Sequence, residues 1–548
     1  MPQSFRARAL ALLLDIATVL AIALALAALY GAANLWPAGF RPIFPPLGGA
    51  IFDVSRPNYY PWTDLAENIH AAFLVAHGHR VYAYGALSHT PGVPEFIGAA
   101  MRLFGFSHAT PSAQTATAAY LTASFATLAF QSACVYGSLR SFAFSAAAAA
   151  AVTLAVVAST AFAYHFALPM SERLIAYLLI VVPLFAWRMI AASDPASRLV
   201  AAVWLGGPVT FGFLSLGLTV GPVNVVVALA CLCVLLVALW RDPRATFDTL
   251  LYDRRCWTAC AVAAAILAAT LALCKTSDLW FWAVAINFDT QFYPWPTLRE
   301  SFAAHMRGFF TFRDPLGSRY PELVLALAGF AAVTLIAARR EGRFAKAARN
   351  IALFVALIAL AAFLTQWRFN TGHKSATMFG LTVGVVILLL ASLPGWLRQA
   401  PNLLLVPLFA FAALQWNFVS AARSYTTQAA PRIPALDEAR VCRSGETQNC
   451  RCMQVMVFGP QTFLVNDMRP CPDRTPTFNI LIGQNAVTRG WLMNDIRNPA
   501  KAFWVYGDAM MKENGIPDDA IRYWRSEARC VRMDERQSVC FAPGEPRP

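Results

Sequence analysis

Eleven runs of mostly apolar residues dominate the chain up to residue 422. A helix needs about 20 consecutive apolar residues to cross the hydrocarbon core of a bilayer. Charged residues make up 14% of the chain, against about 25% in soluble domains. The sequence therefore predicts a polytopic α-helical membrane protein with eleven transmembrane helices. The runs lie at 9–34, 115–137, 142–163, 174–192, 199–218, 220–240, 257–274, 321–338, 350–366, 376–393 and 402–422.

The first run follows Arg6 and Arg8, as the apolar stretch of a signal peptide would. It is too long for that role, so we expect a retained first helix. Asp15 lies early in this run and is expected at the cytoplasmic interface.

Basic residues predict the orientation, because cytoplasmic loops of membrane proteins are enriched in lysine and arginine. With the N-terminus inside, the inside segments hold 15 Lys and Arg in 58 residues, and the outside loops hold 12 in 143. The N-terminus is thus expected to be cytoplasmic and the C-terminal domain periplasmic. The high alanine and arginine usage indicates a bacterium, so the membrane is expected to be a bacterial inner membrane. The net charge of +14 then reflects topology, and we expect no nucleic-acid partner.

The segment 423–548 is expected to form a separate periplasmic domain after a transmembrane module over 1–422. It holds six cysteines, and an even number in an oxidising compartment predicts two or three disulfides whose pairing stays open. Cys450 and Cys452 are expected to bond to different partners. No CxxC spacing supports zinc there, and the cysteines near the apolar runs are expected to be packing residues.

The fold expected for this domain is small and α+β. Strands are predicted at 455–458 and 477–482, where β-branched and aromatic residues gather. A helix with an acidic first turn is predicted at 518–524. The 17 basic and 14 acidic residues of 423–548 indicate an ordinary solvated surface.

Acidic residues of the membrane module gather in the outside loops, while the apolar runs are mostly free of them. A transporter usually places ionisable or helix-breaking sites near the bilayer midplane. This distribution therefore favours an outward-facing active site near the membrane surface.

The first outside loop, 37–114, is the most informative stretch. Thr63 can cap a helix that begins at Asp64, and Glu67 lies one turn further on. Apolar residues of this segment share one face, so we expect an amphipathic helix on the membrane. A second amphipathic helix is predicted over 94–104, ended by Gly105.

This loop resembles that of the GT-C superfamily of glycosyltransferases, which includes protein O-mannosyltransferases and aminoarabinose transferases. The matching residues are Asp64, Gly78, Tyr82, Pro91 and Leu103-Phe104-Gly105. The resemblance covers 37–110, and beyond it rests on hydropathy alone. Leu65 departs from the pattern, since many members have a second acid there. The resemblance implies a GT-C-like fold and sugar transfer from a polyprenyl-phosphate donor to an envelope glycan, lipid or protein.

Candidate site residues follow from the resemblance and from the chemistry. Inverting transfer needs a base for the acceptor hydroxyl, and Asp64 is expected to be it. Glu172 matches a second functional carboxylate, with a helix-terminal acid as the alternative, and Glu67 either substitutes for the missing acid or is solvated. Some family members use a divalent metal with paired acids. With one clear acid here, a metal is the less favoured alternative and no cofactor is expected. Candidate substrate-binding residues are His89, Arg319, Arg368, His373 and Lys374.

Other functions remain open on the sequence alone. An O-antigen ligase or polymerase would also have about a dozen helices, but its large loop usually lies late in the chain. A transporter or flippase would need midplane polar sites or repeated halves, which the sequence lacks. A non-enzymatic assembly protein whose tail binds a partner is the remaining alternative.

Overall fold

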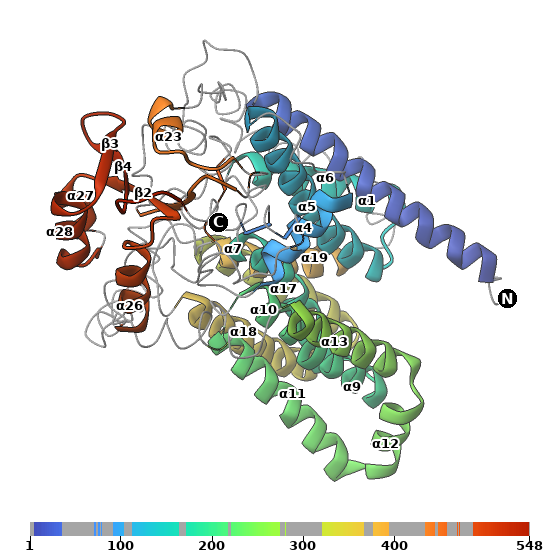
Figure 1. The fold of residues 1–548 in the computed structure, drawn as a ribbon. Coiled ribbons are helices and arrows are strands. Elements are labelled where there is room, and N and C mark those ends of the chain that lie inside the picture. The colour runs from blue at the N-terminus through green and yellow to red at the C-terminus, as the bar shows by residue number, and fades with distance from the viewer. Residues whose placement is uncertain are drawn as a thin grey trace.

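The computed structural model describes residues 5–34, 71–72, 75–76, 78, 91–103, 112–163, 171–217, 221–273, 280, 320–366, 376–393, 433–443, 446, 448–456, 468–469, 471, 486–513 and 515–546. Helices form the first part of the chain, and a four-stranded sheet with short helices forms the C-terminal part (Figure 1). The protein is therefore a polytopic helical membrane protein with a small C-terminal α+β region.

The helices of the membrane part coincide with the expected apolar runs, while the run at 402–422 lies outside the described residues. Seven helical segments of the described part are long and apolar enough to cross a bilayer, and two shorter apolar helices accompany them. The elements are α1 (Phe5–Asn34), α4 (Gly92–Leu103), α5 (Ser112–Ser141), α6 (Ala146–Ala163), α7 (Ser171–Leu178), α8 (Val181–Ala191), α9 (Pro195–Trp204), η2 (Leu205–Val209), α10 (Thr210–Leu216), α11 (Gly221–Arg241), α12 (Pro243–Tyr252), α13 (Arg254–Leu273), α17 (Tyr320–Arg340), α18 (Phe344–Gln366) and α19 (Ala376–Ala391).

Two of the expected runs are broken helices. The run at 174–192 divides into α7 and α8 at a turn over 179–180. The run at 199–218 contains the π-helical segment η2, with Pro208 inside it. A proline has no backbone N–H to donate, and a π-bulge is a usual way to accommodate such a break.

Helix α12 was not expected, and it joins α11 to α13 (Figure 1). Its first turn is capped by Asp242, whose carboxylate accepts from the Ala245 N–H at 3.0 Å, and Pro243 occupies the first helical position. Both are standard N-terminal signals. They lie between the apolar runs at 220–240 and 257–274, where a loop is expected.

Asp15 links α1 to α5. Its carboxylate accepts a hydrogen bond from Tyr136 Oη at 2.6 Å and lies 3.3 Å from Nε of Arg140. Arg140 ends α5 in a segment predicted to face the cytoplasm. The expected position of Asp15 near that interface agrees with this pairing, although the topology itself stays a prediction.

The C-terminal sheet has the strand order β1-β2-β4-β3. Strands β1 (Cys452–Val455) and β2 (Lys501–Tyr506) are parallel, and α26 (Ala486–Asp495) lies in the connection between them. Strand β4 (Gln537–Phe541) runs antiparallel to β2 and to β3 (Arg529–Arg532). The other described helices are α23 (Pro434–Glu438), α27 (Asp508–Glu513) and α28 (Asp518–Ser526).

The local predictions for this region have mixed outcomes. The helix with the acidic first turn is confirmed as α28. The strand predicted at 455–458 was placed too late, because β1 ends at Val455. A buried side chain at every position of β1 hides the alternation that would have located it. The strand predicted at 477–482 lies outside the described residues.

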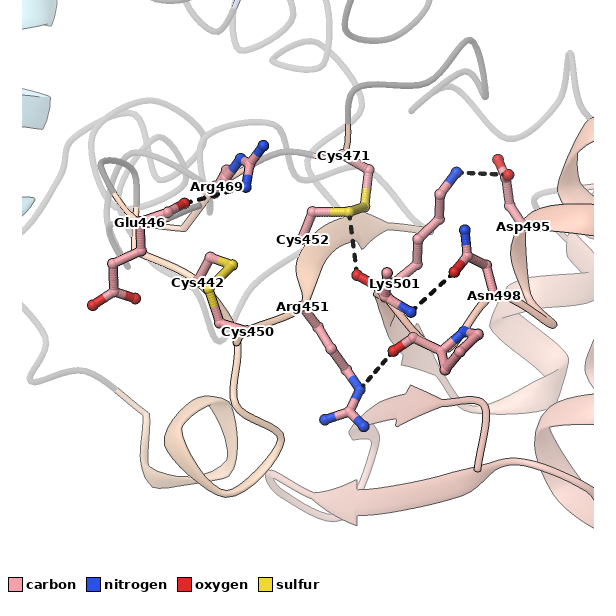
Figure 2. The surroundings of a disulfide bond; sticks show 12 residues. Cys442, Glu446, Cys450, Arg451, Cys452, Arg469, Cys471, Asp495, Asn498 and Lys501 are labelled. Atoms are coloured by element: carbon pink, nitrogen blue, oxygen red, sulfur yellow. Dashed lines mark hydrogen bonds and ion pairs between the residues drawn. A yellow bond between two sulfur atoms is a disulfide. The ribbon is translucent and has the colours of Figure 1, made fainter. Parts of the chain in front are cut away.

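Three disulfides pair the tail cysteines: Cys442–Cys450, Cys452–Cys471 and Cys530–Cys540. Cys450 and Cys452 bond to different partners, as predicted. Between them lies Arg451, whose guanidinium donates to the carbonyls of Pro499, Ala439 and Gly544 (Figure 2 shows the first of these bonds). Arg451 also stacks over the Phe541 ring, with Cζ 4.2 Å from the centroid.

Of the cysteines in the membrane part, Cys231 and Cys256 are buried, as expected for packing residues. Cys233 and Cys260 are exposed on the helix surface instead. Because Cys233 lies two residues after Cys231 on α11, the two side chains point in different directions from one helix.

Candidate functional site

The first outside loop places two helical segments against each other. Residues 71–72 and 75–76 are helical, and the segment ends at Gly78, which has a positive φ of 86°. The Gly78 N–H donates to the Val75 carbonyl at 3.0 Å, as in a glycine-terminated helix. Arg102 at the end of α4 donates from Nε to the same carbonyl at 2.9 Å and from Nη2 as well. These bonds fix the second expected loop helix, confirmed as α4, against the first.

Helix α4 is amphipathic, as predicted, and its apolar face is buried. Phe96 packs edge-on against Phe130 of α5, with 6.0 Å between ring centroids. The backbone at Gly92 approaches Ser215 of α10 so closely that a Cβ there would overlap the Ser215 carbonyl. Thr270 of α13 in turn donates to the Ser215 hydroxyl at 3.2 Å. The loop is therefore seated on two membrane helices, α5 and α10, and the Ser215 side of this contact is held in turn by α13.

A cavity of about 560 Å³ lies between the helices next to α4, and Gly92, Phe96 and Ser215 line part of it. Its walls come from α4, α5, α7, α8, η2, α10 and α13, together with Trp204 at the end of α9. We call it the groove. Gly92 and Phe96 lie at one end, next to Phe130, and Ser141 and Arg188 lie at the other. Because Phe130 and Ser141 are eleven residues apart on α5, the groove extends about 16 Å along the bundle.

Apolar side chains form most of the groove, and its charged lining group is Arg188. The Arg188 Nη2 donates to the Ser141 carbonyl at 2.9 Å, and Cζ lies 4.6 Å from the Phe142 ring centroid. The groove thus has the shape and polarity for a hydrocarbon chain, with one cationic end.

Glu95 is an acidic residue next to the end of the groove that Gly92 and Phe96 line. It lies in the first turn of α4, beside Phe96, and is half-buried. Burial raises the pKa of Glu95 from its ordinary 4.5 to about 7, and the positive charge of Arg102 partly offsets this. A carboxyl with a pKa near 7 exchanges protons at physiological pH.

Most of the predicted site residues lie outside the described residues. Glu172 is the second residue of α7, and Leu174 and Leu178 of the same helix line the groove. The residues outside the described ranges are Asp64, Glu67, His89, Arg319, Arg368, His373 and Lys374. Within the described ranges, no group of three His, Cys, Asp or Glu side chains could hold a metal ion.

The groove is not evident from the amino-acid sequence. One signal was present: Ala133, Gly137, Ser138 and Ser141 place small side chains at helical spacing along α5. Such a stripe leaves room beside a helix. It also occurs where helices pack closely, so the sequence alone could not distinguish a groove from a packing face.

Comparison with known proteins identifies the fold. No protein-family model matches the chain, and no curated protein sequence matches it. Among solved structures, the chain is similar to ArnT from Cupriavidus metallidurans bound to undecaprenyl phosphate, with a TM-score of 0.50 and 12% identity over 95% of this chain and 97% of that one. The same protein in the apo state gives a TM-score of 0.42, with 13% identity over 97% and 98% of the two chains. An oligosaccharyltransferase from Archaeoglobus fulgidus gives 0.37, with 12% identity over 93% and 73%.

The first of these similarities spans nearly the whole of both chains. ArnT is an aminoarabinose transferase, one of the GT-C proteins that the first outside loop resembles. The expected GT-C-like fold is therefore confirmed.

Proposed function

We propose that the protein is a membrane glycosyltransferase that moves a sugar from a polyprenyl-phosphate donor to an envelope glycan, lipid or protein acceptor on the periplasmic side. The observation that carries this proposal is the shared fold with ArnT, whose structure holds undecaprenyl phosphate. The groove adds support, because an apolar channel about 16 Å long suits part of an isoprenoid chain. The loop that carries Asp64 also contributes α4, which lies at one end of the groove.

In the proposed reaction, Asp64 accepts the proton of the acceptor hydroxyl as its oxygen attacks the anomeric carbon of the donor sugar. The bond from that carbon to the phosphate oxygen breaks, and the electron pair leaves with the polyprenyl phosphate. This leaving group needs mainly positive charge, which Arg319, Arg368, His373 and Lys374 would supply. Glu172 and Glu67 would act as further catalytic carboxylates, and His89 would orient the donor or the acceptor. No step requires a metal.

The base assignment is tested with the purified full-length protein, a radiolabelled polyprenyl-phosphate sugar and membrane acceptors. We expect Asp64→Asn to lower the transfer rate by about 10²- to 10⁴-fold, and Glu172→Gln to lower it less. Glu341→Gln, in the loop between α17 and α18, is the matched control and should transfer at the parent rate. Transfer by Asp64→Asn at the parent rate would show that another group is the base. Failure of the parent to bind any polyprenyl-phosphate sugar would overturn the donor class.

The role of the groove is tested with Gly137→Leu. Gly137 lines the groove, and a Cβ added there would have nothing within 4 Å, so the larger side chain extends into the groove without a clash at Cβ. We expect a higher KM for the donor with kcat little changed. An unchanged KM would place the donor chain elsewhere. Gly329→Ala on α17, whose Cβ would make an ordinary 3.5 Å contact with Leu389, controls for a glycine replacement outside the groove.

A further inference from the structure

The groove has a charged residue at the end away from the first outside loop, where a donor tail needs none. Arg188 lines that end, and no described carboxylate makes an ion pair with it. Nearby Arg140 differs, since its Nε lies 3.3 Å from the Asp15 carboxylate. A guanidinium has five N–H donors, and the Arg188 bond to the Ser141 carbonyl uses Nη2. Arg188 is thus a half-buried cation held by neutral groups.

Arg188 lies far from the described part of the first outside loop. The proposed reaction uses Asp64 of that loop, whose helix α4 contacts α5 through Phe96 and Phe130. Ser141, which holds Arg188, is about 16 Å further along α5. A phosphate at the first outside loop is therefore out of reach of this guanidinium.

We propose that this end of the groove binds the headgroup of an anionic phospholipid, with its acyl chain along the apolar wall. Basic pockets between membrane helices on the cytoplasmic side are typical sites for anionic lipid headgroups. An arginine is also well suited to a phosphate, because its planar fork can donate two parallel hydrogen bonds. The charge tally places this end of the groove on the cytoplasmic side. The lipid would therefore enter from the leaflet opposite the donor sugar.

The binding is measured by native mass spectrometry of the full-length protein in detergent, with phosphatidylglycerol or phosphatidylcholine added at equal concentration. We expect the parent to retain phosphatidylglycerol in preference. Arg188→Gln should reduce this preference at least tenfold, because the charge-assisted hydrogen bonds from the guanidinium to the phosphate are lost. Arg188→Lys keeps the charge and should retain part of the preference. This second variant also shows whether a loss in Arg188→Gln reflects the charge or misfolding.

Arg198→Gln is the matched control. It removes a basic side chain from the same predicted side, where Arg198 donates to the Ala192 carbonyl and does not line the groove. This variant should keep the parent's preference. Equal binding of both lipids by the parent, or an equal loss in Arg188→Gln and Arg198→Gln, would overturn the proposal and leave Arg188 as an interfacial anchor. Inorganic phosphate added to the parent should not displace the lipid, since it lacks the chain.

These measurements use no sugar donor, so their outcome is separate from that of the transfer assay. Gly137→Leu is measured both in the transfer assay and in the lipid-binding experiment. It should weaken retention of phosphatidylglycerol if the acyl chain lies in the groove, and full retention would contradict that placement. Donor transfer can fail while the lipid preference persists, and the reverse also holds.

Discussion

The membrane helices and the C-terminal α+β region are stabilised in different ways. Between membrane helices, lipid offers as apolar a surrounding as another helix, so close packing of small residues drives association. Gly380 and Gly384 of α19 illustrate this, since a Cβ at either would overlap a backbone carbonyl of Ala176 or Ile180. The C-terminal region instead has a buried core in water, three disulfides and the Arg451 hydrogen bonds. The stability of the membrane part therefore depends on how closely the helices approach each other. The stability of the C-terminal region depends on its core, its disulfides and its hydrogen bonds.

The largest expected effect is that of Gly380→Ala. The added methyl group collides with the Ala176 carbonyl, so α19 must move away from α7, and we expect a loss of about 3 kcal/mol. Gly329→Ala gains the same helix propensity, about 1 kcal/mol, without a clash, and should be neutral or stabilising. The thermal midpoint of the purified protein in detergent measures both. Equal midpoints for the two variants would mean that close helix approach does not limit stability here.

A smaller effect is expected for Arg451→Met in the C-terminal region. Three carbonyls lose their donor, and we expect a loss of about 2 kcal/mol. Arg522→Met removes an exposed arginine from α28 and should cost little. Limited proteolysis of the full-length protein in increasing urea, with C-terminal fragments followed, compares the two. If Arg451→Met resists proteolysis as well as Arg522→Met, the disulfides and the buried core hold this region without the Arg451 hydrogen bonds.

Membrane helices were predictable because a single physical requirement, spanning the bilayer, produces an apolar run of fixed length. The helix α4 was also predictable, since its apolar face is a local signal, whereas Gly78 was identified only through the resemblance to the GT-C loop. Helix α12 shows the limit of hydropathy. Its Asp242-Pro243 start is a local signal, yet a short helix that does not span the membrane leaves no long apolar run.

The groove and the Arg188 environment were not predictable, because they depend on how several helices far apart in sequence are arranged. The same reasoning applies to the disulfides. That Cys450 and Cys452 have different partners follows from their proximity in sequence, whereas the pairing with Cys442 and Cys471 depends on the fold. The catalytic roles of Asp64 and Glu172 remain predictions, to be decided by the transfer assay.

The smallest expected effect concerns Glu95, where the membrane module meets water. Its pKa is raised from 4.5 to about 7 in the folded protein, so the folded state holds this proton more tightly than the unfolded state. The contribution of Glu95 to the free energy of unfolding is therefore fully present below pH 4.5 and is lost as the pH rises through about 7.

The variant Glu95→Gln has no carboxyl that titrates at this position. Its thermal midpoint should match the parent's at pH 4.5 and exceed it by a few degrees at pH 8. Glu535→Gln, at an exposed carboxyl in the turn before β4, is the matched control for replacing a glutamate by glutamine. A constant difference between Glu95→Gln and the parent across this range would mean that Glu95 is solvated, and that the seat of α4 on the membrane helices is more open than the structure indicates.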